Sequence, residues 1–588
     1  MQLIMLLIFL PMVSAFAVVL SRSMALQYML TGVTALTLTL ISGYLFFTPL
    51  EFSVNSVALL DYLFIGADII LLLFFISQGY AFKNMKVLGL ALLQLLIYLF
   101  IEIFLAHGGG VFLHVDTLAK VMFLIINGVG GIIVVYALHY MRDEAMSALK
   151  KRFFIAGLLL FLSIMNLIVM ANSLLLFFFL FEMTTLASYL LIAFRGDDIS
   201  RANALRALWM NQIGGVVILL GTVVAIGAFE SVYFDVLMHA SGGYLLFVIA
   251  LLSMAAWVKG ALLPFDSWLL GAMVAPTPVS AILHSATMVK IAPFMILKFA
   301  PVLAGTLAGS LLSVGASLVF VAASYLALSK EMLKEILGYS TIALLALMMA
   351  IAAIGTAESS VLVMVLIFFH AVSKALLFLG AGVIEKQHHV KSIEAMKGLV
   401  ERAPQSTWIM ILGFIALTLP PFGLFMGKLW AIELLASTLV VMPQYLIVLL
   451  ALIVGSVIMV LLYFKVASHL LANRSDEAPH EKEYLPIGFS FPLYYLIALL
   501  GFATLFLLYN AHENALYWLG LPFMIIIIVP YFLKTLRSFD RSKVYHCGER
   551  EEFDGAELYF QLNALSRERL YLFFTLIFIG LGVSGVLS

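Results

Sequence analysis

Almost the whole chain is divided into apolar runs of about 20 residues, each long enough to cross the hydrocarbon core of a bilayer as a helix. We identify about eighteen such runs, at 1–20, 26–49, 57–80, 87–106, 118–138, 153–172, 174–194, 207–229, 243–261, 277–299, 303–328, 338–356, 359–384, 407–435, 439–466, 489–510, 515–534 and 567–587. Only 11% of the residues are charged, whereas soluble domains carry about 25%. The sequence therefore predicts an all-α, polytopic membrane protein with about 16–18 transmembrane helices.

Positive charge alternates between successive loops. The loops after odd-numbered runs, including 142–152 and 534–569, carry all but six of the 32 Lys and Arg residues. The loops after even-numbered runs, such as 50–56, 230–242 and 511–514, contain none. Because Lys and Arg collect on the cytoplasmic side of a membrane protein, this alternation predicts that both termini face away from the cytoplasm.

One segment, 255–299, combines charged side chains with prolines inside otherwise apolar sequence. It contains, in order, Lys259, Pro264, Pro276, Pro278, His284 and Lys290. A charge near mid-membrane costs roughly 2.5 to 3.5 kcal/mol on insertion scales, so a charge found there indicates function. Backbone interrupted by proline at that depth must be buried in protein or line a wet cavity, because lipid offers its carbonyls no hydrogen bonds. An ion path is the first interpretation.

Other spans add ionisable side chains of the same kind. They are Glu182, then His370 and Lys374, which lie four residues apart on one helical face, and Lys428, which follows a predicted break at Pro420 and Pro421. One buried lysine alone could have a structural role, by donating a hydrogen bond to a carbonyl that a neighbouring proline leaves without a partner. A set of such groups, tuned by burial and by neighbouring charge, instead predicts a coupled proton wire. Lys120 and Lys298 lie at span ends, where snorkelling to the interface explains them.

Three long motifs resemble one family. PTPVSAILHSATMVK, HAVSKALLFLGAGVI and TLPPFGLFMGK are similar to signatures of the antiporter-like subunits of respiratory complex I, of multisubunit cation/proton antiporters and of membrane-bound nickel–iron hydrogenases. The similarity runs from about residue 115 to residue 466. It implies two inverted five-helix repeats, each with a discontinuous helix. We therefore expect three regions: N-terminal helices at 1–114, an antiporter-like core at 115–466, and C-terminal helices with a polar cytoplasmic loop and a final transmembrane anchor at 467–588.

The resemblance also implies roles for the buried residues. Glu182 corresponds to a glutamate that pairs with a lysine, which here is Lys259. The central relay would consist of His284, Lys290, His370 and Lys374. Lys428 would be the last lysine before the exit. The implied location is the inner (cytoplasmic) membrane of a prokaryotic cell.

The sequence also departs from the family. KGALLPFDSWL replaces the usual KSAQxPLHxWL, so Asp266, expected at the membrane edge, stands where relatives have a histidine. Two spans, 57–80 and 87–106, are additional and contain Asp61, Asp68 and Glu102. Asp61 and Asp68 share a helical face, which indicates either a polar seam against another subunit or simple placement at the membrane interface.

Cysteine content limits what the chain can bind. Its one cysteine, Cys547, cannot hold an iron–sulfur cluster or a structural zinc ion, so we expect no cofactor in this chain and any electron transfer in partner chains. The resemblance to nickel–iron hydrogenases implies that those partners hold iron–sulfur clusters and a nickel–iron site. Around Cys547, the pattern YxCGE resembles a motif in energy-converting hydrogenases of the Ech type and in formate hydrogenlyases. Expected partners are other membrane subunits, a soluble redox arm, the lipid bilayer and H⁺ or Na⁺; no nucleic acid is expected.

The leading hypothesis is a non-redox, proton- or Na⁺-translocating subunit of an energy-converting nickel–iron hydrogenase or formate hydrogenlyase. The alternatives are an antiporter-like subunit of complex I (NADH:quinone oxidoreductase) and a subunit of a redox-independent Na⁺/H⁺ antiporter. A structural anchor is disfavoured, because an anchor requires no series of costly intramembrane charges. Neighbouring genes would discriminate these cases, since only a hydrogenase requires a nickel–iron large subunit.

Overall fold

The computed structural model describes residues 2–49, 51–55, 58–105, 110–439, 442–472, 483–510, 571 and 573–580. Its helices are α1 (Gln2–Leu20), α2 (Met24–Phe47), α3 (Ala58–Ala81), α4 (Met85–Phe104), α5 (Thr117–Phe123), α6 (Gly130–Arg142), α7 (Ala148–Ile168), α8 (Leu174–Ile192), α9 (Asp198–Phe229), α10 (Phe234–His239), α11 (Gly243–Lys259), α12 (Asp266–Gly271), α13 (Thr277–Ser285), α14 (Ile291–Leu303), α15 (Leu307–Leu328), α16 (Leu333–Ala352), α17 (Ala357–His388), α18 (Leu399–Arg402), α19 (Pro404–Thr418), α20 (Gly423–Thr438), α21 (Tyr445–Leu471) and α22 (Ile487–Asn510).

The predicted fold class is confirmed. Within the described residues, 15 helical segments are long and apolar enough to cross a membrane, and α11 is a shorter apolar helix. These segments match the predicted runs from the N-terminus to Asn510. The predicted run 515–534, Cys547 and most of the run 567–587 lie outside the described residues. The chain is therefore a multi-pass, helical membrane protein.

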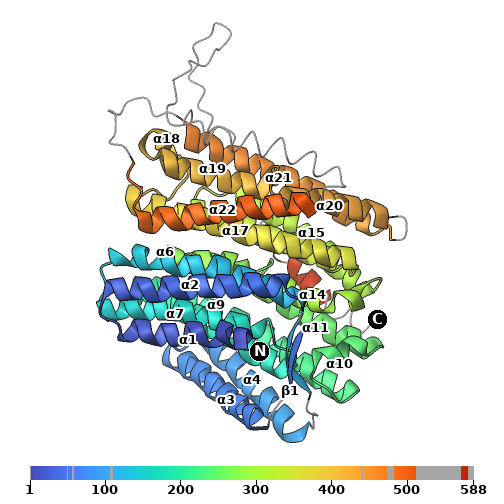
Figure 1. Cartoon of the computed structure of the whole chain (residues 1–588). Helices are drawn as coiled ribbons and strands as arrows, with labels where there is room; N and C mark the ends of the chain where they lie inside the picture. The colour runs from blue at the N-terminus through green and yellow to red at the C-terminus, as the bar shows by residue number, and fades with distance from the viewer. Residues whose placement is uncertain are drawn as a thin grey trace.

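The helices form a bundle with a distinct interior and periphery (Figure 1). In α16, 94% of an apolar 18-residue stretch is buried inside the protein. The corresponding share is only 28% in both α3 and α4. Helix α15 packs between α16 and α21, while α1 packs on α7, and α4 packs on α9. The segments with the ionisable side chains thus lie inside, and α1–α4, α21 and α22 form the outside.

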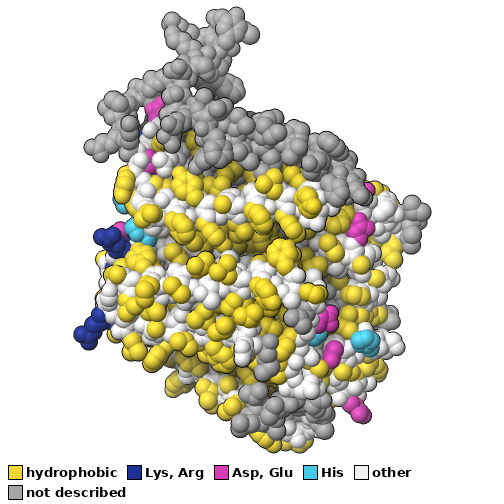
Figure 2. Space-filling model, viewed as in Figure 1, with side chains coloured by type: hydrophobic (Ala, Val, Ile, Leu, Met, Phe, Trp, Pro, Cys, Tyr) yellow, Lys and Arg dark blue, Asp and Glu magenta, His cyan; other side chains and the backbone are white. Residues whose placement is uncertain are grey.

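The surface fits a bilayer. Figure 2 shows apolar side chains over most of the visible face, with Lys and Arg at one end of the helices and mainly Asp, Glu and His at the other. The broad apolar belt can contact lipid, and the polar ends can contact water. The orientation of the termini stays a prediction.

Three spans contain irregular backbone near their middle. Helix α11 ends at Lys259 and α12 begins at Asp266, with Pro264 between them; α19 and α20 are separated by Pro420 and Pro421. Pro276 and Pro278 lie instead at the start of α13. A third interruption separates α13 from α14 and contains a short 3₁₀ turn, η4 (Met288–Lys290). Backbone of this kind is tolerated at membrane depth only inside protein, and all three breaks are largely buried.

A small antiparallel sheet joins the additional helices to the core. Strand β1 (Phe52–Asn55) pairs with β2 (Val111–Val115), with Phe52 opposite Val115. Directly after β2, Asp116 caps α5 by accepting from the Ala119 N–H and forms a 2.7 Å ion pair with Lys298. Burial raises the pKa of Asp116, but Lys298 and these hydrogen bonds more than offset it, so the pKa is lowered overall. Lys298 therefore has a structural partner.

Candidate functional site

Glu182 occupies a completely buried position in α8. Its Oε1 atom accepts a 2.8 Å hydrogen bond from Nε2 of Gln94 in α4, and the same Nε2 donates to the Gln212 carbonyl of α9 at 3.0 Å. The second carboxylate oxygen, Oε2, has no hydrogen-bond partner among the described residues. Three helices therefore enclose one carboxylate and leave one of its oxygens available for a proton or a water molecule.

Gly215 of α9 makes this contact possible. A Cβ atom added at Gly215 would overlap Glu182 Oε1 and Gln94 Nε2. We expect Gly215→Ala to lower the melting temperature of the purified protein, because overpacking a buried contact typically costs about 1 to 3 kcal/mol. Gly221→Ala on the same helix is the control, since its Cβ would meet Leu251 Cβ at an ordinary 3.7 Å. Equal melting temperatures for the two variants would contradict this expectation.

Lys259, the last residue of α11, reaches back onto α8. Its Nζ atom donates to the Phe181 carbonyl and to the Thr185 hydroxyl, both at 3.0 Å, and lies 3.8 Å from the centroid of the Phe181 ring. The structure thus brings Lys259 to the helical turn that carries Glu182. Within the described part of the chain, however, the two side chains form no direct ion pair, because Lys259 binds backbone and hydroxyl oxygens. Their coupling is electrostatic at longer range.

Lys290 and His370 are in direct contact. The Lys290 Nζ atom hydrogen-bonds to His370 Nδ1 and also lies 3.4 Å from the His284 carbonyl oxygen. Lys290 belongs to the break between α13 and α14, and His370 to the middle of α17. All three residues are fully buried. The broken helix therefore delivers a lysine to a histidine of the other half of the bundle, which is a geometry suited to passing a proton.

The remaining members of the predicted relay are nearby in the fold but have separate partners. Lys374, one turn after His370, donates to the Leu337 carbonyl at 3.0 Å and to the Ser340 hydroxyl at 2.5 Å, both on α16. The His284 ring packs against Phe378, with centroids 4.6 Å apart, and neither of its nitrogens has a partner among the described residues. His284 therefore contacts Lys290 through its backbone carbonyl, which accepts a hydrogen bond from Lys290 Nζ, and not through its ring.

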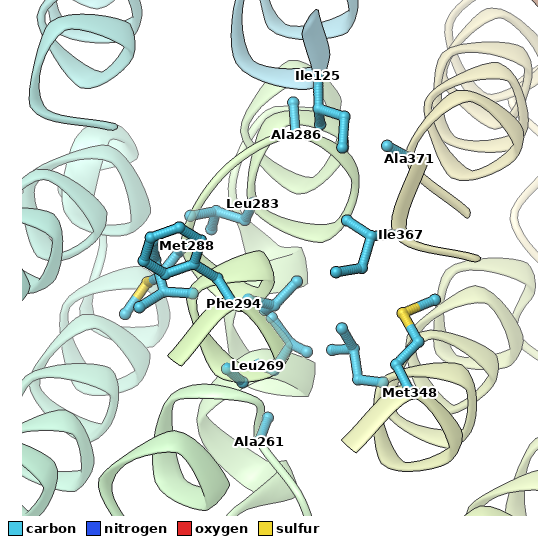
Figure 3. Close-up of a cluster of buried hydrophobic side chains, with 14 of the residues drawn as sticks. Ile125, Ala261, Leu269, Leu283, Ala286, Met288, Phe294, Met348, Ile367 and Ala371 are labelled. Atoms are coloured by element: carbon cyan, nitrogen blue, oxygen red, sulfur yellow. The ribbon is translucent and has the colours of Figure 1, made fainter. Parts of the chain in front are cut away.

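Apolar side chains pack tightly in this region (Figure 3). They come from the π-helical turn η1 (Leu124–Val129), from the segment 261–294 and from α16 and α17. The labelled members are Ile125, Ala261, Leu269, Leu283, Ala286, Met288, Phe294, Met348, Ile367 and Ala371. The labelled Leu283, Met288 and Ala371 are within two residues of His284, Lys290 and His370, so these buried polar groups have largely apolar surroundings.

Lys428 lies shortly after the break at Pro420 and Pro421, within the first two turns of α20. Its side chain is 4% exposed and has no hydrogen bond or ion pair to the described residues. Lys120 is also buried, but it differs in having a partner, since its Nζ atom donates to the Thr48 carbonyl at 2.7 Å. A buried ammonium group without a structural partner is costly, which favours a functional role for Lys428.

Asp266 is fully buried inside the protein, and its expected placement at the membrane edge stays a prediction. It begins α12, directly after the break at Pro264, and its Oδ2 atom accepts hydrogen bonds from Tyr339 at 3.1 Å and from Tyr571 at 2.8 Å. Tyr339 precedes Ser340, the partner of Lys374. A carboxylate therefore lies beside this break, held by two tyrosine hydroxyls.

Sequence reasoning identified the charged residues but missed their neutral partners. Gln94, Thr185 and Ser340 all contact predicted site residues, yet a single Gln, Thr or Ser in a span carries no distinguishing signal. The break at Met288–Lys290 was also missed, since it contains no proline. An i, i+4 spacing of polar residues in α4, where Gln94 and Tyr98 occur, is the signal that could have revealed the inward face of that helix.

Comparison with family models supports the same core. Residues 171–462 match the membrane domain described as "NADH:quinone oxidoreductase/Mrp antiporter, TM", and residues 110–154 match "NADH-Ubiquinone oxidoreductase (complex I), chain 5 N-terminus". These two matches include every predicted site residue from Glu182 to Lys428.

Curated relatives resemble about half of the chain. A probable K⁺/H⁺ antiporter subunit of Rhizobium meliloti is 32% identical over 54% of this chain and 32% of its own length. A Na⁺/H⁺ antiporter subunit of Alkalihalophilus pseudofirmus is 32% identical over 53% of this chain and 41% of its own length. NADH-quinone oxidoreductase subunit L of Mycobacterium tuberculosis is 33% identical over 54% of this chain and 50% of its own length. The chain thus spans half or less of the length of these relatives.

Two solved structures share the fold. One is the membrane-bound sulfane sulfur reductase, an archaeal respiratory membrane complex, with a TM-score of 0.65 and 20% identity over 86% of this chain and 95% of the other. The second is the Mrp complex of Dietzia sp. DQ12-45-1b, with a TM-score of 0.64 and 20% identity over 99% of this chain and 55% of the other.

Proposed function

We propose that this chain moves protons across the membrane as a subunit of a larger complex. The sequence support is that residues 171–462 match the membrane domain of NADH:quinone oxidoreductase and Mrp antiporter subunits, and residues 110–154 match the N-terminus of chain 5 of complex I. One observation carries the proposal: the apolar bundle buries a series of ionisable side chains, three of which lie at or shortly after helix breaks. They are Glu182, Lys259, Lys290, His370, Lys374 and Lys428. Each ionisable group inside a membrane protein costs free energy, so a series of them indicates that they have a function.

The proposed path passes from one half of the bundle to the other. We call each proton-binding position along the path a station. Glu182 and Lys259 form the first station, and Lys290 with His370 forms the second. Lys374 is the third, and Lys428 is the last group before the exit. A charge that moves at one station alters the proton affinity of the next, so the stations titrate as a coupled set. The apolar side chains between them prevent uncontrolled leakage. Na⁺ is the alternative ion, which oxygen ligands would have to bind.

We further propose that the driving reaction belongs to an energy-converting nickel–iron hydrogenase or formate hydrogenlyase, with the redox centres in partner chains. The support is the YxCGE pattern around Cys547, which lies outside the described residues. Relatives named as complex I and antiporter subunits support the two alternative complexes equally well. In each case this chain supplies the ion path, and a neighbouring membrane subunit transmits the driving force.

Purification of the affinity-tagged chain with its partners tests this assignment. We expect nickel, iron–sulfur clusters and hydrogen turnover in the complex, and no iron–sulfur cluster in the separated chain, because its single cysteine cannot hold one. Quinone reduction by NADH in the purified complex would identify a complex I instead. Ion exchange without any redox cofactor would identify an antiporter. Stoichiometric iron in the isolated chain would contradict the proposal.

A further inference from the structure

The additional helices α3 and α4 pack directly against the helices that enclose Glu182. Helix α4 packs on α9, and α3 packs on α8; the two helices lie at one edge of the bundle (Figure 1). Gln94, Tyr98 and Glu102 recur every four residues along α4, so they form a stripe on one face of that helix. At about 1.5 Å per residue, this stripe extends roughly 12 Å from the Glu182 contact toward the end of α4.

The side chains of this stripe are connected. Gln94 holds Glu182 by the 2.8 Å hydrogen bond described above. Further along, the Tyr98 hydroxyl interacts with the carboxylates of both Asp68 and Glu102, and Asp68 also interacts electrostatically with Glu182. The Tyr98 ring stacks on Phe178 of α8, with centroids 6.0 Å apart. Asp68 and Tyr98 are buried, while Glu102, near the end of α4, is half-buried.

Three acceptor oxygens face this region without a hydrogen-bond donor among the described residues: Asp68 Oδ1, Gln94 Oε1 and Glu182 Oε2. Their residues are at most 2% exposed. Buried acceptors of this kind normally have a donor. A protonated carboxyl group donates one hydrogen bond to a neighbouring acceptor, and a bound water molecule donates two. Donors of these two kinds would supply the missing partners, and both are what a proton-conducting path requires.

We propose that α3 and α4 form a second proton branch, running from Glu102 through Tyr98 and Asp68 to Glu182. The proposal rests on the proposed function, because Glu182 must itself be a station of the translocation path. In each transfer, protonated Asp68 gives its proton to Glu182. The Tyr98 hydroxyl then donates its proton to Asp68 and accepts one from Glu102, so each proton delivered is matched by one taken up. The additional helices would thus connect Glu182 to the membrane surface within a single chain.

A purely structural role is the competing explanation. Under that explanation, Asp68, Tyr98 and Gln94 serve only to fix α3 and α4 to the core, and their effect on proton movement is through assembly alone. The two explanations predict different translocation rates for a variant that keeps the side-chain shape but loses the exchangeable proton. A structural role predicts a normal rate, and a proton branch predicts a slow one. Tyr98→Phe is such a variant, because it keeps the ring on Phe178. Asp68→Glu is the converse, since it keeps the exchangeable proton.

The experiment measures proton translocation by the complete complex in membrane vesicles at matched complex content. We expect Asp68→Asn and Tyr98→Phe to slow translocation at least tenfold, equivalent to about 1.4 kcal/mol in barrier height, and Asp68→Glu to retain most of the rate. Glu433→Gln, an exposed carboxylate on α20, is the matched control and should behave as wild type.

The outcomes separate this inference from the proposed function. Wild-type rates for assembled Asp68→Asn or Tyr98→Phe, together with an inactive Glu182→Gln, would overturn the branch and leave the function standing. A wild-type rate for Glu182→Gln would instead overturn the proposed function. If Asp68→Asn fails to assemble, the assembled Tyr98→Phe complex decides: a tenfold loss supports the branch, and a normal rate overturns it.

Discussion

Vesicles containing Glu182→Gln are expected to lose coupled proton translocation while the complex still assembles. Glutamine has nearly the shape of glutamate and can keep the contact with Gln94, but it carries no charge and releases no proton at neutral pH. Lys259→Ala should have the same effect, because Lys259 is the only basic side chain that reaches the Glu182 turn of α8 among the described residues. Acidification of the vesicle lumen, measured with a pH-sensitive dye, provides the readout.

Two controls make this prediction specific. Glu358→Gln removes an exposed carboxylate from the first turn of α17, where it accepts a hydrogen bond from Trp430 and is not one of the buried groups of the proposed path. That variant should translocate protons normally. The amount of assembled complex, measured by quantitative blotting, must match wild type in all variants. Normal acidification with Glu182→Gln or with Lys259→Ala would remove both residues from the path.

Lys428→Met should also abolish translocation, whereas Lys428→Glu should retain part of it. The reason is that a proton leaving the buried relay needs a titratable group beside the break at Pro420 and Pro421, and a carboxylate can replace an amine in that role. Methionine fills a similar volume and removes the charge, so packing is little changed. The same dye measurement applies.

Lys298→Met is the matched control for Lys428, since Lys298 is a span lysine with a structural ion pair to Asp116. It should reduce stability and leave the rate per assembled complex unchanged. Indifference of the rate to Lys428→Met would make Lys428 a structural residue. Equal losses with methionine and glutamate would show that the lysine itself, rather than any titratable group, is required.

The sequence was sufficient to predict the spans and the buried charges. Spans are recognisable because a membrane demands about 20 consecutive apolar residues, and a lysine such as Lys374 is conspicuous inside one. Lys120 and Lys298 were assigned correctly to span ends, although their partners, the Thr48 carbonyl and Asp116, became clear only in three dimensions.

The remaining features depend on contacts between distant segments. Gln94 and Glu182 are 88 residues apart, and Lys290 and His370 are 80 residues apart, so no local pattern could pair them. Likewise, Gly215 matters only because two other helices place polar side chains against it. The bonds from Lys259 to the Phe181 carbonyl and to the Thr185 hydroxyl likewise join residues 78 and 74 positions apart.

The most direct test of a proton path through this chain replaces Lys290, the residue at which a broken helix meets α17. Proteoliposomes containing the complete complex with Lys290→Met are compared with wild type and with Lys120→Met, which removes a span-end lysine. We predict lumen acidification at the level of empty liposomes for Lys290→Met, and at the wild-type level for Lys120→Met, with equal complex content. Wild-type proton translocation by assembled Lys290→Met complex would contradict the proposal that protons cross the membrane through the buried relay of this chain.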